Sequence, residues 1–141
     1  MTPKKILVVD DSLVILKVLS LKLKSAGYTV LTGTDGAEAI STARQERPDL
    51  IVLDISFPPD VAHGGGVKWD AFTLMAWMKR AEETAHTPVI IITSSDPVKV
   101  KDKALAAGAA AFFQKPIDHD ALVAAIGRVL GESGPETPSA A

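Results

Sequence analysis

The chain has 141 residues, enough for one domain with a single core and too few for a second domain beside it. Hydrophobic residues make up 47% and charged residues 23%, and the net charge of −2 gives no basic surplus for binding nucleic acid. Cysteine is absent, which excludes disulfides, thiol chemistry and cysteine-based metal sites. The apolar run near the N-terminus is too short for a signal peptide or a membrane span, so we expect a cytoplasmic protein that does not bind membranes.

Strands and helices are predicted to alternate from the N-terminus. An apolar run at 6–9 predicts a buried strand, and apolar residues at helical spacing over 13–24 predict an amphipathic helix after it. A second strand is predicted at 28–31 and a second helix at 37–47. The third strand, at 50–53, is an unbroken apolar run, which is typical of a strand covered on both faces of a parallel sheet.

One irregular stretch interrupts this alternation. Residues 56–68 contain two prolines and three consecutive glycines, and they predict a long loop. A third helix is predicted from about residue 70, followed by a strand at 89–92 and a helix at about 97–107. A short fifth strand is predicted at 111–114.

The last predicted element is a helix that Asp118 caps and that extends to about residue 130. Residues 131–141 are rich in Gly, Pro, Ser, Thr and Ala and are expected to be disordered. We therefore expect one domain over 1–130 with an α/β fold, in which a doubly wound, five-stranded parallel sheet carries helices on both faces.

Polar residues follow four of the five predicted strands. Asp10 and Asp11 come after the first strand, Asp54 after the third, Thr93 after the fourth and Lys115 after the fifth. The carboxyl ends of parallel strands share one edge of the sheet, so these side chains should lie close together. One acid at a strand end is usually a turn former or a helix cap, but four polar strand ends together favour a functional cluster.

The residue types in this cluster indicate a particular chemistry. Three neighbouring carboxylates repel one another unless a cation neutralises them, and hard oxygen ligands suit Mg²⁺. A carboxylate beside such an ion can attack phosphorus and form an aspartyl phosphate. Lys115 could then neutralise the phosphoryl oxygens while the Thr93 hydroxyl donates a hydrogen bond to one of them.

These residues resemble a known family, the receiver domains of two-component response regulators, over residues 4–130. The resemblance implies a flavodoxin-like strand order 2-1-3-4-5 and a stand-alone regulator similar to those of chemotaxis. The shared features are the acidic pair Asp10-Asp11, Asp54 with Pro58 four positions later, Thr93 and Lys115-Pro116.

The resemblance also implies a role for each residue of the cluster. Asp54 would accept a phosphoryl group from a sensor histidine kinase or a phosphotransfer protein. Asp11, Asp54 and the backbone carbonyl of Ser56 would bind Mg²⁺ directly, whereas Asp10 would hold it mainly through water. Lys115 would pair with the phosphoryl oxygens. Such a domain is no enzyme beyond its own phosphorylation and autodephosphorylation.

The resemblance further implies a switch formed by Thr93 and Phe112. Thr93 would draw its loop toward the phosphoryl group and vacate space that the aromatic ring of Phe112 then fills. Phe112 stands where the family more often has Tyr, and it lacks a hydroxyl for binding a partner. Ordinary strand packing is an equally good interpretation of Phe112. The output would be a changed surface that another, unidentified protein reads, without direct DNA binding.

The clearest departure from the family is an insertion at 59–68, where a short turn is usual. The simpler interpretation is a tolerated surface loop, because its three glycines favour mobility. The alternative is that the insertion, with Trp69 as an anchor, covers Asp54 and controls access of the phosphoryl donor or hydrolysis.

Two other classes of protein are weaker alternatives. A metal-dependent phosphohydrolase with an aspartyl nucleophile would need a second acid two positions after Asp54, where this chain has Ser56. A flavodoxin-like nucleotide binder needs a Gly- or hydroxyl-rich loop after the first strand, and Asp10-Asp11 would repel its phosphate.

Overall fold

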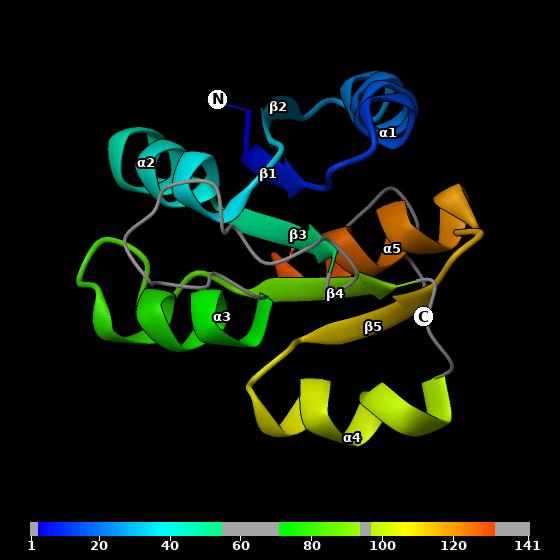
Figure 1. Cartoon of the computed structure of the whole chain (residues 1–141). Coiled ribbons are helices and arrows are strands. Elements are labelled where there is room, and N and C mark those ends of the chain that lie inside the picture. Colours follow the sequence, from blue (N-terminus) through cyan, green and yellow to red (C-terminus); the bar gives the residue numbers. More distant parts are fainter. Residues whose placement is uncertain (1–2, 55–70, 94–96, 132–141) are drawn as a thin grey trace.

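The computed structural model describes residues 3–54, 71–93 and 97–131, and it contains a five-stranded parallel sheet (Figure 1). The strand order is β2-β1-β3-β4-β5, which confirms the predicted fold and order. The strands are β1 (Lys5–Val9), β2 (Thr29–Gly33), β3 (Leu50–Asp54), β4 (Val89–Thr93) and β5 (Ala111–Gln114). The helices are α1 (Leu13–Ser25), α2 (Gly36–Glu46), α3 (Ala71–Arg80), α4 (Pro97–Ala106) and α5 (His119–Val129).

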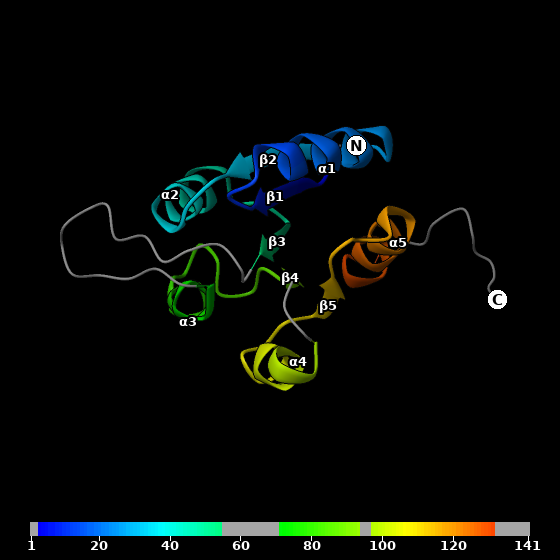
Figure 2. The ribbon, with the colours of Figure 1, turned by 45° about the vertical axis from the view of Figure 1, so that its right-hand side comes forward.

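Helices cover both faces of the sheet, as Figure 2 shows. Side chains alternate along a strand, so Leu7 and Ile51 pack toward α2, α3 and α4, whereas Ile6 and Leu50 pack toward α1 and α5. The central strands are therefore buried on both sides, which explains why their sequences are unbroken apolar runs.

The predicted elements agree with the structure to within a few residues. The largest difference among the strands is β2, which begins at Thr29 and continues to Gly33 because its last residue pairs with Val9 of β1. The predicted cap Asp118 is present, since its side chain accepts a hydrogen bond from the backbone N–H of Ala121, and the side chain of Ser12 caps α1 in the same way. The predicted loop 56–68, its insertion 59–68 and nearly all of the tail 131–141 lie outside the described residues.

Helix α1 differs from a simple amphipathic helix. Its buried face consists of Leu16, Leu19 and Leu23, as its helical spacing predicts. Other apolar residues of the same helix point to solvent, and the side chains of Leu13 and Val14 are 71% and 72% exposed. Val18 and Leu21 are exposed as well. Because these side chains lie largely outside the core, α1 has a second apolar surface that faces solvent.

The described part of the chain contains no helix that combines the length and the apolar character needed to cross a bilayer.

Candidate functional site

The parallel sheet brings the polar strand ends to one edge. Asp10 directly follows β1, Asp54 is the last residue of β3, Thr93 is the last residue of β4 and Lys115 directly follows β5. In the sheet, β1 lies beside β3, β3 beside β4 and β4 beside β5. The arrangement follows from the sequence because each of these polar residues stands where an apolar run ends.

Three carboxylates form the centre of this cluster. Asp10, Asp11 and Asp54 each offer an oxygen atom, and these oxygens lie within 4.8 Å of one another. The side chains of Asp10 and Asp54 are 0% and 1% exposed, whereas Asp11 is open to solvent. Burial strengthens the repulsion between the two inner carboxylates, so the cluster favours a cation.

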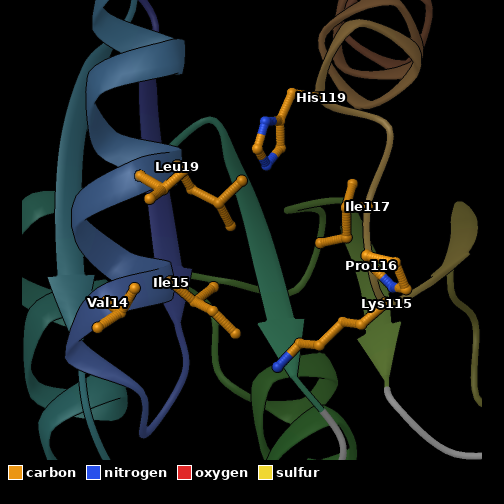
Figure 3. Close-up of a pocket in the computed structure, with 8 residues that line it drawn as sticks. Val14, Ile15, Leu19, Lys115, Pro116, Ile117 and His119 are labelled. Carbon is orange, nitrogen blue, oxygen red and sulfur yellow. The ribbon is translucent and has the colours of Figure 1, made fainter.

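Lys115 supplies one positive charge to this cluster. Its Nζ atom donates to Oδ2 of Asp10 at 2.8 Å and to Oδ2 of Asp54 at 3.2 Å. Figure 3 shows the side chain extending from the end of β5 toward the end of β3. Burial alone would lower the pKa of this ammonium, but the hydrogen bond to Asp10 and the charges of Asp54 and Asp10 outweigh it and raise the pKa above the usual lysine value.

Asp10 is held in place by hydrogen bonds to its backbone and to its side chain. Its backbone N–H donates to the carbonyl of Gly33 in β2 at 3.1 Å. Its Oδ1 accepts from the N–H of Ser12 at 2.9 Å, and its Oδ2 accepts from Lys115. Both carboxylate oxygens therefore have donors within the protein, which fits a residue that reaches a metal ion through water rather than directly.

The three carboxylates suit Mg²⁺ better than a softer metal. Their oxygens are hard ligands, and the open side of Asp11 leaves room for the water molecules that Mg²⁺ retains. In the described part of the chain, the lysine that pairs with the cluster balances only one of its three negative charges. The charge and chemistry of the site thus fit a divalent cation.

Thr93 is completely buried at the end of β4. Its carbonyl accepts a hydrogen bond from the backbone N–H of Lys115 at 2.7 Å. This bond links the residue after β5 to the end of β4.

Phe112 lies on β5, beside Ile91 of β4. Its ring is half-buried and packs against the cluster of side chains beneath α2, α3 and α4. A ring that is partly packed and partly exposed fits both ordinary strand packing and a switch. The predicted switch of Phe112 therefore stays a prediction. The other predicted site residue, Ser56, lies outside the described residues.

A groove beside the carboxylates was not foreseen from the sequence. It has a volume of about 460 Å³ and lies between α1 and the segment that follows β5 (Figure 3). Lys115 belongs both to this groove and to the carboxylate cluster. Val14 and Val18 of α1 were the signal in the sequence for this groove. Their helical spacing alone could not show whether their face of the helix is exposed or buried. The other lining residues are Val14, Ile15, Val18, Leu19, Pro116, Ile117 and His119.

Comparison with known proteins gives the family. Residues 6–127 match the family described as response regulator receiver domain. The chain therefore belongs to this family, and the resemblance seen in the sequence is confirmed. Receiver domains are signalling domains rather than metabolic enzymes, and they interact with histidine kinases or phosphotransfer proteins.

Solved structures support the same conclusion. The chemotaxis response regulator CheY4 of Vibrio cholerae is 31% identical with a TM-score of 0.77, over 91% of this chain and 99% of that one. The receiver domain of the sensor histidine kinase PA1611 of Pseudomonas aeruginosa is 25% identical with a TM-score of 0.78, over 93% of this chain and 100% of that one. The structure of the PA1611 domain has a magnesium ion coordinated in its active-site cleft.

Among curated relatives, the DNA-binding dual master transcriptional regulator RpaA of Synechocystis is 33% identical over 126 residues. This match covers 89% of the present chain and 48% of RpaA. The chain thus spans about half the length of this relative, and the likeness concerns the receiver domain alone.

Proposed function

We propose that this receiver domain accepts a phosphoryl group on Asp54 from a histidine kinase or a phosphotransfer protein, in a reaction that requires Mg²⁺. The observation that carries the proposal is the position of Asp54. Its carboxylate is buried at the end of β3, paired with Lys115 and within 4.8 Å of an oxygen from each of two other acids.

Asp11, Asp54 and the backbone carbonyl of Ser56 would hold the metal ion, with Asp10 acting through water. The bound ion would supply positive charge against the phosphoryl oxygens. The exposure of Asp11 and the internal hydrogen bonds of Asp10 support this division of roles.

The transfer itself would use an oxygen of Asp54 as the nucleophile. As the new P–O bond forms, the P–N bond of the donor phosphohistidine breaks and the imidazole keeps the electron pair. Lys115 would pair with the phosphoryl oxygens because its ammonium already lies 3.2 Å from Oδ2 of Asp54.

The donor would bind over α1 and the groove beside it. Val14, Val18 and Leu21 recur at spacings of four and three residues and form an exposed stripe that a partner helix could cover. Lys115 joins the groove to the carboxylate cluster, so a helix seated there would carry its phosphohistidine beside Asp54. The exposed lysines next to the stripe, Lys17 and Lys24, favour a helix with acidic flanks.

The output would be a protein surface that changes on phosphorylation. The hydrogen bond between Lys115 and Thr93 supports coupling between the site and β5, where Phe112 lies. We propose that Thr93 and Phe112 form the switch, that the domain comprises residues 1–130 and that the protein acts in the cytoplasm. The role of the insertion 59–68 concerns residues outside those described.

Labelled acetyl phosphate tests the proposed reaction. The protein should incorporate label only with Mg²⁺, EDTA should prevent incorporation, and hydroxylamine should release the label because it cleaves acyl phosphates. Label that survives hydroxylamine, or that forms equally well in EDTA, would contradict an Mg²⁺-dependent aspartyl phosphate.

A further inference from the structure

The side chain of Asp10 makes an ion pair with a cation that the protein itself provides. The Nζ atom of Lys115 is 2.8 Å from Asp10 and 3.2 Å from Asp54, so the shorter of the two ion pairs is with Asp10. The side chain of Asp10 is 0% exposed and that of Lys115 is 15% exposed. Water therefore screens this pair poorly.

A metal ion among the three acids would stand close to the same ammonium. Asp10 and Asp54 both contact Lys115, and both contribute oxygens to the group that spans less than 4.8 Å. A dication bound there must therefore share these two carboxylates with the ammonium of Lys115. The ammonium stays near the metal ion as long as its ion pairs with Asp10 and Asp54 are intact. Two cations that share the same buried carboxylates repel each other.

From this geometry we infer that Lys115 is a built-in counter-ion that opposes Mg²⁺ binding, so that the Lys115–Asp10 ion pair and the bound metal weaken each other. The inference rests on the proposed Mg²⁺ site and adds a regulatory property to it. Such coupling is reciprocal. If the Lys115–Asp10 ion pair lowers the affinity for Mg²⁺ by some factor, bound Mg²⁺ weakens the ion pair by the same factor.

The consequence is an ordered use of one lysine. Without metal, Lys115 partly offsets the charge of the two buried acids. Once the metal is bound, the ammonium is held less firmly by Asp10 and becomes available to a phosphoryl group on Asp54. The affinity for Mg²⁺ is therefore lower than the three carboxylates alone would give.

Calorimetric titration with Mg²⁺ tests this inference without any measurement of activity. The variant Lys115→Met should bind Mg²⁺ at least about tenfold more tightly than the wild type, which is the effect of removing one close like charge. Lys115→Arg keeps the charge and should bind within about threefold of the wild type. Lys5→Met is the matched control, because Lys5 lies at the opposite end of β1 and pairs with Glu46.

The possible outcomes separate the inference from the proposed function. Tighter binding by Lys115→Met alone supports the inference, as does binding by this variant when the wild type binds no Mg²⁺. Equal binding by wild type and Lys115→Met overturns the inference but leaves the metal site standing. Absence of binding by both proteins overturns the inference and the proposed metal site together.

Thermal unfolding provides a second readout if Lys115→Met folds poorly. Lys115→Gln retains a hydrogen-bond donor for Asp10 but not the charge, and Mg²⁺ should raise its melting temperature more than that of the wild type. An equal rise in both proteins would overturn the inference.

Discussion

Lys115 and Asp10 are 105 positions apart in the sequence, yet the ammonium of one lies 2.8 Å from the carboxylate of the other. The contact joins the segment after β5 to the segment after β1, and β3 and β4 lie between these two strands in the sheet. The same ammonium contacts Asp54, so one positive charge is shared by the two buried acids of the site.

Removal of this ammonium should destabilise the metal-free protein. In EDTA, Lys115→Met should lower the free energy of unfolding by about 3 kcal/mol, because two buried carboxylates lose their partner. Urea denaturation measures the change, and Lys5→Met controls for the loss of one positive charge. A loss no larger than that of Lys5→Met would show that the buried pair contributes little.

The same ion pair predicts a loss of stability at alkaline pH. The pKa of Lys115 is raised in the folded protein, so its contribution is complete below the ordinary lysine pKa of about 10.4. The contribution is lost as the pH rises through the higher, folded-state value. The difference in stability between wild type and Lys115→Met should thus be constant up to about pH 10 and shrink above it. Urea denaturation across this range would contradict the account if the difference stayed constant throughout.

The two neighbouring acids Asp10 and Asp11 should respond oppositely to neutralisation. In EDTA, Asp11→Asn should raise the melting temperature by a few degrees, because it removes one of three like charges without breaking an ion pair among the described residues. Asp10→Asn should lower it, because the charge partner of Lys115 is lost. Differential scanning calorimetry measures both changes, and a fall for both variants would mean that repulsion among the acids is negligible.

The exposed stripe on α1 should affect only transfer from a protein donor. Val18→Glu should slow transfer from a phosphorylated kinase or phosphotransfer protein by at least about tenfold, since it places a charge in an apolar contact. Labelling by acetyl phosphate should be unchanged, because this small donor needs no docking surface. Leu105→Glu is the matched control, as Leu105 is an exposed apolar residue of α4. Equal slowing by both variants would contradict docking on α1.

Much of the fold was predictable because it depends on local patterns. The unbroken apolar runs at 6–9 and 50–53 mark strands that are buried on both faces, and the polar residues that follow them mark the edge of the sheet. The end of β2 was less predictable, since Gly33 joins this edge strand only through its pairing with Val9.

The site was predictable as a set of residues but not as a set of contacts. The sequence places Asp10, Asp54 and Lys115 at one edge of the sheet. It does not predict that Lys115 lies closer to Asp10 than to Asp54, because that depends on distances between strands that no local pattern contains. The exposed stripe of α1 could not be predicted from the sequence for a related reason. Helical spacing fits Val14 as well as Leu16, and only the assembled fold decides which of them is buried.

The proposed phosphorylation of Asp54 is tested most directly by the intact mass of the protein after incubation with acetyl phosphate and Mg²⁺. Wild type and Asp102→Asn, which alters an exposed acid of α4, should each gain the mass of one phosphoryl group. Asp54→Asn should remain folded and gain nothing. A full phosphoryl gain on folded Asp54→Asn would contradict the account, because another residue would then be the phosphoacceptor.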